Sequence, residues 1–506
     1  MAHFCRFFRM QTATSFSLAL LLLTTVSVDA NAFKKASSAP KSEKSADNSL
    51  NLPVKAGAQW EEAVPTVGTL NTGDSSKSVS TLSTQLEAQF PDKEWWNQYQ
   101  DAYLGRYMSD ALRDSPRIEA SIHRIEQSRA QVVKTRSDQL PHLSFSPGYA
   151  HLGLPSLGGG GDLPSNISLF LLSFMPSYQV DLFGLNADRT RSAKTELKAV
   201  EQDSRALLLS VQGEVATAYF NLLRSDYEVS SQQESLELFQ KIHSLKENQH
   251  QVGLTSYDEV IRSERDVAQA LTNLTNYKQQ QAMFAHQLAV LTGRPPQSES
   301  HLERGKLQDV QLPLTTQTGT VDGLLARRPD IAAQELRLKR SAIDVTVARK
   351  RFLPTIKLSA YAAWAGSSLG KTFSSDSFSN IEMVQGNQPI YEGGAWVGEK
   401  RLQKAKQKEQ IANYRQTILT AMKEVEDQLS LLKTSYDALN SNSERLDLTK
   451  HALEITQDQQ NHGLIPKLNV YQAQSELLQY EQLKAQSKSD AAIATVNLYK
   501  ALGGGF

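Results

Sequence analysis

Cysteine is almost absent from this chain. Only one of the 506 residues, Cys5, is a cysteine, and it lies in a stretch that begins MAHFCRFFRM and continues as the apolar SFSLALLLLTTVSV. A basic start, a short apolar run and an Ala-x-Ala site ending at Ala32 are typical of a secretory signal peptide, here residues 1–32. We therefore expect export after cleavage, and a mature chain without disulfides, thiolate chemistry or a lipid-modified cysteine.

Long apolar runs and net charge are also missing. No stretch after residue 32 reaches the ~20 apolar residues that a membrane helix needs. The 54 basic and 54 acidic residues balance, so bulk electrostatics gives no reason to expect nucleic acid as a partner. Low hydropathy does not exclude a membrane location, because transmembrane strands alternate and leave a weak signal.

Motifs for catalysis and metal binding are missing as well. The ten histidines are scattered, without a His-Glu-x-x-His motif, and no Gly-x-Ser-x-Gly elbow occurs. The stretch AGSSLGKTF (365–373) fits a relaxed phosphate-binding pattern, but a P-loop needs a helix opening directly after it. The following FSSDSFSN has no helical period, so we expect no helix before Gly394. We predict no enzyme, no catalytic residues, no cofactor and no metal.

Proline and glycine are scarce in two long stretches, 187–250 and 395–461. Neither contains proline, and each contains one glycine. Apolar residues recur in both at steps of three, four and seven, which indicates a coiled-coil seam. Each helix should be roughly 95–100 Å long, far longer than a globular domain uses. The recurring residues are Leu207, Val211, Val215, Ala218, Leu222, Val229 and Leu236, then Ile411, Tyr414, Ile418, Val425, Leu429, Leu432, Tyr436 and Leu439.

The sequence contains an internal duplication. QHQVGLTSYDEV (249–260) matches QQNHGLIPKLNV (459–470), and three further landmarks recur in the same order. In each unit a helical approach ends at a proline, two strands enclose a Gly/Ser-rich loop, and two helices follow. TIKLSAYAAW (355–364) alternates between apolar and polar residues, as a half-buried strand does. The predicted divisions are a leader, extended or disordered, at 33–90, a first unit at 91–300, a linker at 301–320 and a second unit at 321–506.

Each long helix is expected to reverse at a glycine. Gly253 and Gly463 suit the left-handed residue that ends a helix. Ser256 and Glu259 form a capping-box pattern for the first return helix, and Pro466 suits the first turn of the second. The predicted unit is therefore a β-hairpin plus an antiparallel helical hairpin.

Four strands are too few to close a barrel. Open strand edges in a membrane cost several kcal/mol per unpaired group. The chain is therefore expected to complete its sheet with strands from copies of itself.

Several segments together resemble the outer membrane factors, the TolC-like channel subunits of tripartite efflux pumps. They include WWNQYQDAYLGRYMSDAL, YQVDLFG, LLARRPDIAAQELRLKRSAIDVTVARKRFLPTIKLSA and the closing LYKALGGGF, and the match runs from Trp95 to Phe506. The resemblance implies a trimer whose twelve strands form one β-barrel in outer membrane lipid, continued by an α-helical coiled-coil barrel in the periplasm. It also implies two partners, a periplasmic adaptor protein and an inner-membrane transporter.

Site residues follow from the same resemblance. The adaptor contacts would lie at the two helical tips: Val252, Gly253, Leu254, Thr255 and Ser256, with Gly463, Leu464, Ile465 and Pro466. The family often narrows its tunnel with acidic residues after the second tip, but here those positions are Asn469 and Gln472. Asp258 and Glu259 occupy the equivalent positions of the first unit, where compensation of the helix dipole is an alternative role. These four residues are the candidates for a lumen gate.

Two functions of different class remain from the sequence. The first is a passive trimeric exit duct for efflux or secretion. The second is a periplasmic coiled-coil structural or adaptor protein without a pore, which has no need of paired alternating strands. The sequence leaves the transported substrate open among drugs, metals and polypeptides.

Overall fold

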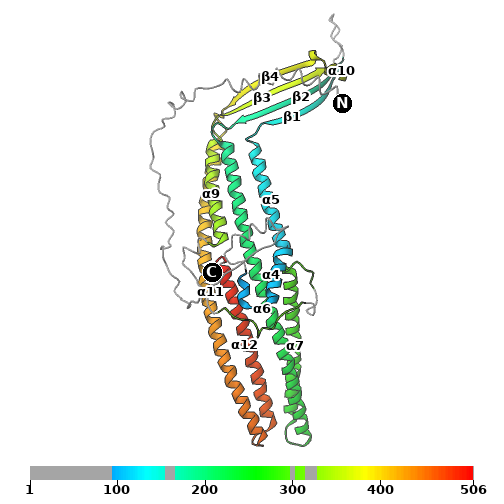
Figure 1. The fold of residues 1–506 in the computed structure, drawn as a ribbon, viewed down its shortest axis with the longest axis vertical. Helices are drawn as coiled ribbons and strands as arrows, with labels where there is room; N and C mark the ends of the chain where they lie inside the picture. Colours follow the sequence, from blue (N-terminus) through cyan, green and yellow to red (C-terminus); the bar gives the residue numbers. More distant parts are fainter. Residues whose placement is uncertain (1–93, 154–165, 297–301, 314–326, 505–506) are drawn as a thin grey trace, which may run out of the picture. The chain divides into compact units, whose positions relative to one another are not determined.

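The computed structural model describes residues 94–153, 166–296, 302–313 and 327–504 (Figure 1). The expected signal peptide, the 33–90 leader and the Gly-rich loop after the first strand lie outside these residues.

Short helices open each half of the chain. A 3-10 helix, η1 (Trp95–Tyr99), precedes α4 (Ala102–Asp114) and α5 (Pro116–Ser137), and α9 (Pro329–Lys350) opens the second half. The Asp101 side chain caps α4 by accepting hydrogen bonds from the amides of Tyr103 and Leu104. Pro116 and Pro329 occupy first-turn positions, where a missing amide hydrogen costs nothing.

Two pairs of long helices dominate the fold. α6 (Leu185–Gln251) and α11 (Ala395–Asn461) each have 67 residues, and α7 (Tyr257–Leu291) and α12 (Lys467–Ala501) each have 35. α6 packs along α7 and α11 packs along α12, while α6 also contacts α12 (Figure 1). The order helix, strand, strand, long helix, return helix therefore occurs twice.

One window of α6 is long and apolar enough to cross a membrane by composition. More than half of that window, 56%, is buried within the unit. Because α6 packs against α5, α7, α9 and α12, these apolar side chains belong to the core of the helical bundle.

The strands form a single antiparallel sheet in the order β1-β2-β3-β4. Its members are β1 (His142–Gly153), β2 (Asn166–Val180), β3 (Thr355–Gly366) and β4 (Phe378–Asn387). Both hairpins were predicted at these places, and the β2–β3 pairing joins the two halves, with Leu172 opposite Trp364. β1 and β4 are the edges, each paired on one side only.

Aromatic residues fill the core where η1, α6 and α12 meet. The rings of Tyr99 and Phe220 lie 4.9 Å apart, and Trp95 stacks on Tyr499 at 4.6 Å. The Tyr99 hydroxyl donates to the Ala492 carbonyl at 3.2 Å, which satisfies a fully buried polar group.

Residues 302–313 pack into this core. Leu302, Leu307 and Val310 are buried there. The hydroxyl of Tyr436 on α11 donates to the Pro313 carbonyl at 2.8 Å, and Lys488 on α12 donates to the Gln308 carbonyl at 2.7 Å. The segment therefore ties α11 and α12 to the rest of the unit.

The prediction of no helix before Gly394 was wrong in detail, because one helical turn forms within AGSSLGKTF itself. α10 (Leu369–Thr372) is a single turn within the β3–β4 connection, followed by a 3-10 turn, η3 (Ser375–Ser377). The Ser368 carbonyl accepts hydrogen bonds from the Lys371 and Thr372 amides and from the Thr372 hydroxyl. These local bonds stabilise one turn without any helical period, and a four-residue turn lacks the long helix dipole of a P-loop.

Candidate functional site

The two helical tips have the same backbone geometry. Gly253 and Gly463 have φ values of 76° and 74°, in the left-handed region. At the first tip the Gly253 amide donates to the His250 carbonyl at 2.9 Å and the Leu254 amide to the Gln249 carbonyl at 2.8 Å. Gly463 and Leu464 repeat these two bonds at the second tip. This pair of bonds is the Schellman motif, which satisfies the last carbonyls of a helix.

The predicted capping box is not formed. The Ser256 side chain makes no capping hydrogen bond, although Ser256 is the residue before α7. The Glu259 carboxylate lies instead 3.2 Å from the Lys246 ammonium on α6 and 3.5 Å from Arg262. Two cations offer the carboxylate stronger charge-assisted partners than a single amide does. Pro466 likewise precedes the first turn of α12, as its N-cap, and does not lie inside that turn.

Apolar side chains at the tips are exposed. Val252, Leu254 and Leu464 are 70%, 78% and 73% exposed, whereas Thr255 and Ile465 are half-buried. The residue after a Schellman glycine commonly packs back on its own helix, but Leu254 and Leu464 leave that contact largely unmade. Exposed apolar side chains gathered on a hydrogen-bonded turn are a typical surface for a protein partner.

Open space surrounds the tip glycines. A Cβ atom added at Gly253 or Gly463 would meet no atom within 4 Å. At Gly293 and Gly503, which end the return helices, it would lie 2.1 Å from the Asp114 carbonyl oxygen and 2.9 Å from Arg328. The turns at the ends of the return helices are therefore packed against neighbouring residues, whereas the turns at the tips are accessible.

The four gate candidates differ in their charge partners. Asp258 pairs with Arg262 at 2.7 Å, so both acidic residues of the first tip are compensated by cations. Asn469 and Gln472 are exposed on the first turns of α12. The structure places each pair just after its tip glycine.

Some features near the tips were missed by the sequence reasoning. The His250 and Tyr257 rings are 5.5 Å apart across the first tip, and the Lys467 ammonium lies 5.5 Å from the Tyr471 ring. A polar groove of about 480 Å³ lies between the C-terminal part of α6 and the first turns of α12. Its lining includes Lys241, Lys467 and Tyr471. Only the i, i+4 spacing of Lys467 and Tyr471 was visible in the sequence as a possible signal.

The sheet has one aromatic face. Strand register places Phe145, Phe174, Trp364 and Phe378 on the same side, one from each strand. Successive ring centroids lie 4.8, 6.1 and 5.0 Å apart, so the rings form a continuous row across all four strands. We call this side the apolar face; it also carries Leu143, Pro147, Tyr149, Phe170, Leu172, Leu358 and Val384.

The opposite face is more polar. It carries Ser144, Ser146, Ser173, Ser177, Gln179, Lys357 and Ser359, together with the apolar Leu169, Leu171, Met175, Ile381 and Met383. This alternation between an apolar, aromatic side and a polar side is typical of strands that separate lipid from an aqueous lumen.

No group of three histidine, cysteine or acidic side chains placed to hold a metal occurs in the part of the chain that the structure describes. The described residues instead offer two exposed helical tips and a two-sided sheet.

Comparisons with known proteins agree with this geometry. The family model described as outer membrane efflux protein matches residues 107–294 and 320–504. The pyoverdine export outer membrane protein OpmQ of Pseudomonas aeruginosa is 29% identical over 422 residues, which cover 82% of this chain and 88% of that protein. The toluene efflux pump outer membrane protein TtgC of Pseudomonas putida is 26% identical over 420 residues, covering 82% and 86%.

A solved structure has the same fold. The Campylobacter jejuni CmeC outer membrane channel superposes with a TM-score of 0.74 at 22% identity, covering 87% of this chain and 94% of that one. The fold is thus that of the TolC-like outer membrane channels, which combine a helical tunnel with a sheet.

The predicted TolC-like fold, the function as an outer membrane efflux channel and the outer membrane location are confirmed, and the alternative of a periplasmic protein without a pore is not supported. The chain belongs to the outer membrane efflux protein family.

Proposed function

We propose that three copies of this chain form one passive exit duct across the periplasm and the outer membrane. The observation that carries the proposal is the open four-stranded sheet, with two unpaired edges and an aromatic row on one face. Pairing β4 of one copy with β1 of the next removes every edge.

Barrel size supports the number of copies. Two copies of this four-stranded sheet would make eight strands, whose interior is about filled by its own side chains. Three copies make twelve strands and leave a lumen. The apolar face then meets lipid and the polar face lines the duct.

The chain's division into two units belongs to the same proposal. The units at 91–300 and 321–506, joined through 301–320, each contribute one hairpin to the barrel and one pair of long helices to the tunnel.

The helical tips are the proposed docking surface for a periplasmic adaptor protein. Leu254 and Leu464 are exposed apolar side chains on turns whose glycines leave open space beside them. An adaptor that covers these side chains removes apolar area from water, which contributes roughly 25 cal/mol per Å². Asp258, Glu259, Asn469 and Gln472, just after the tips, are the proposed gate.

The duct itself performs no chemistry in this proposal, and an inner-membrane transporter supplies the energy. The named relatives carry the words pyoverdine export and toluene efflux, two chemically unlike cargoes. A wide passage that recognises neither cargo explains why one fold serves both. Substrate selection then lies with the transporter.

Two measurements test the duct. The mass of the purified mature protein in detergent should equal three chains plus micelle, and planar bilayers should show small, mostly closed conductances. A monomer without conductance in lipid would overturn the proposal.

Docking at the tips has its own test. Leu464→Asp should abolish efflux in cells while leaving trimer mass unchanged, because a carboxylate prevents burial of this position. Leu271→Asp is the matched control, since Leu271 on α7 is also an exposed leucine, at 54%, and lies away from the tips. Equal efflux in the two variants would argue against tip docking.

A further inference from the structure

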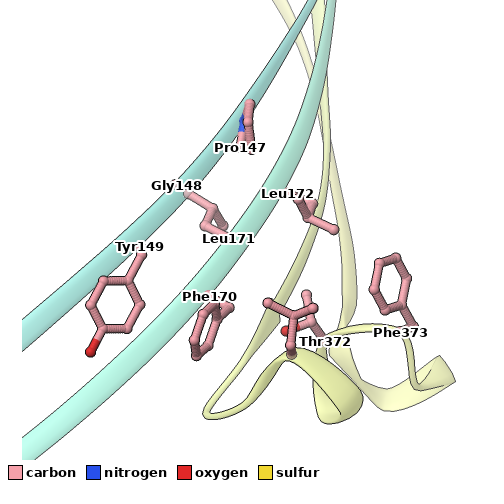
Figure 2. Close-up of a pocket in the computed structure, with 9 residues that line it drawn as sticks. Pro147, Gly148, Tyr149, Phe170, Leu171, Leu172, Thr372 and Phe373 are labelled. Atoms are coloured by element: carbon pink, nitrogen blue, oxygen red, sulfur yellow. The ribbon is translucent and has the colours of Figure 1, made fainter.

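A pocket of about 380 Å³ lies where the β3–β4 connection covers the sheet (Figure 2). Strands β1 and β2 and the turn α10 surround it, and its lining is almost entirely apolar. The chief lining residues are Pro147, Tyr149, Phe170, Leu172, Thr372 and Phe373.

The roof of the pocket is fixed to the sheet by a glycine. A Cβ atom at Gly366, the last residue of β3, would lie 2.6 Å from the Thr372 amide nitrogen, so only glycine allows this close approach. Thr372 is 1% exposed and anchors α10. The turn is therefore held over the apolar face by packing, and the pocket below it is a built feature.

The apolar side chains of the roof remain uncovered. Leu369 and Phe373, at both ends of α10, are 64% and 68% exposed although both line the pocket. Burying large apolar side chains is favourable, so two that stay exposed beside an apolar cavity indicate that a further apolar group belongs there.

The pocket lies on the apolar face, at the end of the sheet that is distant from the long helices. Tyr149 and Phe170, whose rings lie 4.8 Å apart, belong to the apolar face together with the aromatic row. The connection after β3 is at the opposite end of the strands from the long helices, which follow β2 and β4. With the helices in the periplasm, this end lies in the outer leaflet of the outer membrane.

We propose that this pocket holds an acyl chain of lipid A, the phosphate-bearing lipid of that leaflet. The inference rests on the proposed function, which turns the apolar face toward lipid. An acyl chain continues the apolar contacts of the face under α10. Lys371 lies exposed on the same turn, where its ammonium complements a lipid phosphate.

Native mass spectrometry of the full mature protein tests the proposal, with hexa-acylated lipid A as the probe. The variant Phe373→Glu introduces a carboxylate at the rim, and because Phe373 is 68% exposed we expect the fold to be retained. Ser375→Glu is the matched control, since Ser375 is exposed on the same connection but does not line the pocket. We expect one retained lipid A per chain in the wild type and control, and at least ten-fold weaker retention in Phe373→Glu. Equal retention in all three would overturn the inference.

Single-cysteine spin labels separate this inference from the proposed function. Removal of the predicted signal peptide takes away the sole cysteine, so one label reports one site. A label at Phe145, elsewhere on the apolar face, should collide with oxygen dissolved in lipid, and a label at Leu172 should do the same through the pocket. Access at Phe145 alone means that a protein segment or a second copy fills the pocket, which overturns the lipid inference only. Access of a water-soluble relaxation agent at both sites overturns the proposed orientation of the sheet as well.

Discussion

Two glycines with nearly the same backbone conformation should respond very differently to alanine. Gly253 at the first tip and Gly293 at the end of α7 have φ values of 76° and 73°. A Cβ atom at Gly253 meets nothing within 4 Å, whereas at Gly293 it lies 2.1 Å from the carbonyl oxygen of Asp114 and 2.8 Å from its carbon. The comparison therefore separates backbone strain from steric overlap.

The expected magnitudes follow from these distances. A residue with a side chain in the left-handed region costs about 1–2 kcal/mol, and this cost is common to Gly253→Ala and Gly293→Ala. At Gly293 the clash is with main-chain atoms, so the end of α4 must shift, which adds about 1–3 kcal/mol as overpacking does. The second variant should be destabilised by about 2–5 kcal/mol and the first by no more than about 2 kcal/mol.

Thermal unfolding followed by far-UV circular dichroism, in one detergent, measures the difference. Each kcal/mol shifts the midpoint by at most about 2–4 °C in a chain this large. A second pair repeats the test, because a Cβ atom at Gly463 meets no atom within 4 Å and one at Gly503 lies 2.9 Å from Arg328. Equal midpoints within both pairs would refute the steric argument and the claim that the tips are open.

Three further predictions concern charged groups. Arg328→Met should lower the free energy of unfolding in urea by about 2–3 kcal/mol, because the buried Ala501 carbonyl loses a charged donor at 2.8 Å. Burial raises the pKa of the Glu228 carboxyl above its usual 4.5, so the fold loses stability as pH rises from 4.5 through that raised pKa. Glu228→Gln should remove this fall in a series of melts at increasing pH, and an unchanged slope would contradict it. Asp258→Asn should lower the cation preference of the bilayer conductance if this residue faces the lumen, and unchanged selectivity would remove it from the gate.

Helix and strand positions could be predicted because their signals are local. α11 begins after Gly394 and ends before Gly463, with no proline between, and the observed helix spans the predicted 395–461. The alternation of apolar and polar residues predicted β3, and the proline before each hairpin predicted where its first strand begins. Each of these features depends on a few neighbouring residues.

Features that depend on distant residues were not predictable in this way. The Glu259 carboxylate does not cap α7 as expected. The reversal at the first tip places α6 beside α7, and the carboxylate pairs with the Lys246 ammonium at 3.2 Å. The aromatic row needs the register of all four strands, which no single strand contains. The single turn α10 depends on a close approach between Gly366 and Thr372 that no periodicity records.

The two long helices have unequal numbers of packing neighbours within the chain. α6 and α11 have equal lengths and follow equivalent hairpins, yet α6 packs against α4, α5, α7, α9 and α12, whereas α11 packs against α9 and α12. α11 consequently leaves Leu419, Leu431 and Ile455 exposed, and β4 is exposed along its whole length. α6 and α11 thus occupy equivalent places in the two units but are buried to different extents. The second unit lacks packing neighbours that the first unit has within the chain. In the proposed trimer the next copy supplies these neighbours. Assembly of the trimer would therefore close the barrel and cover α11 at the same time. A variant that blocks pairing at β4 should therefore also expose α11 to proteolysis.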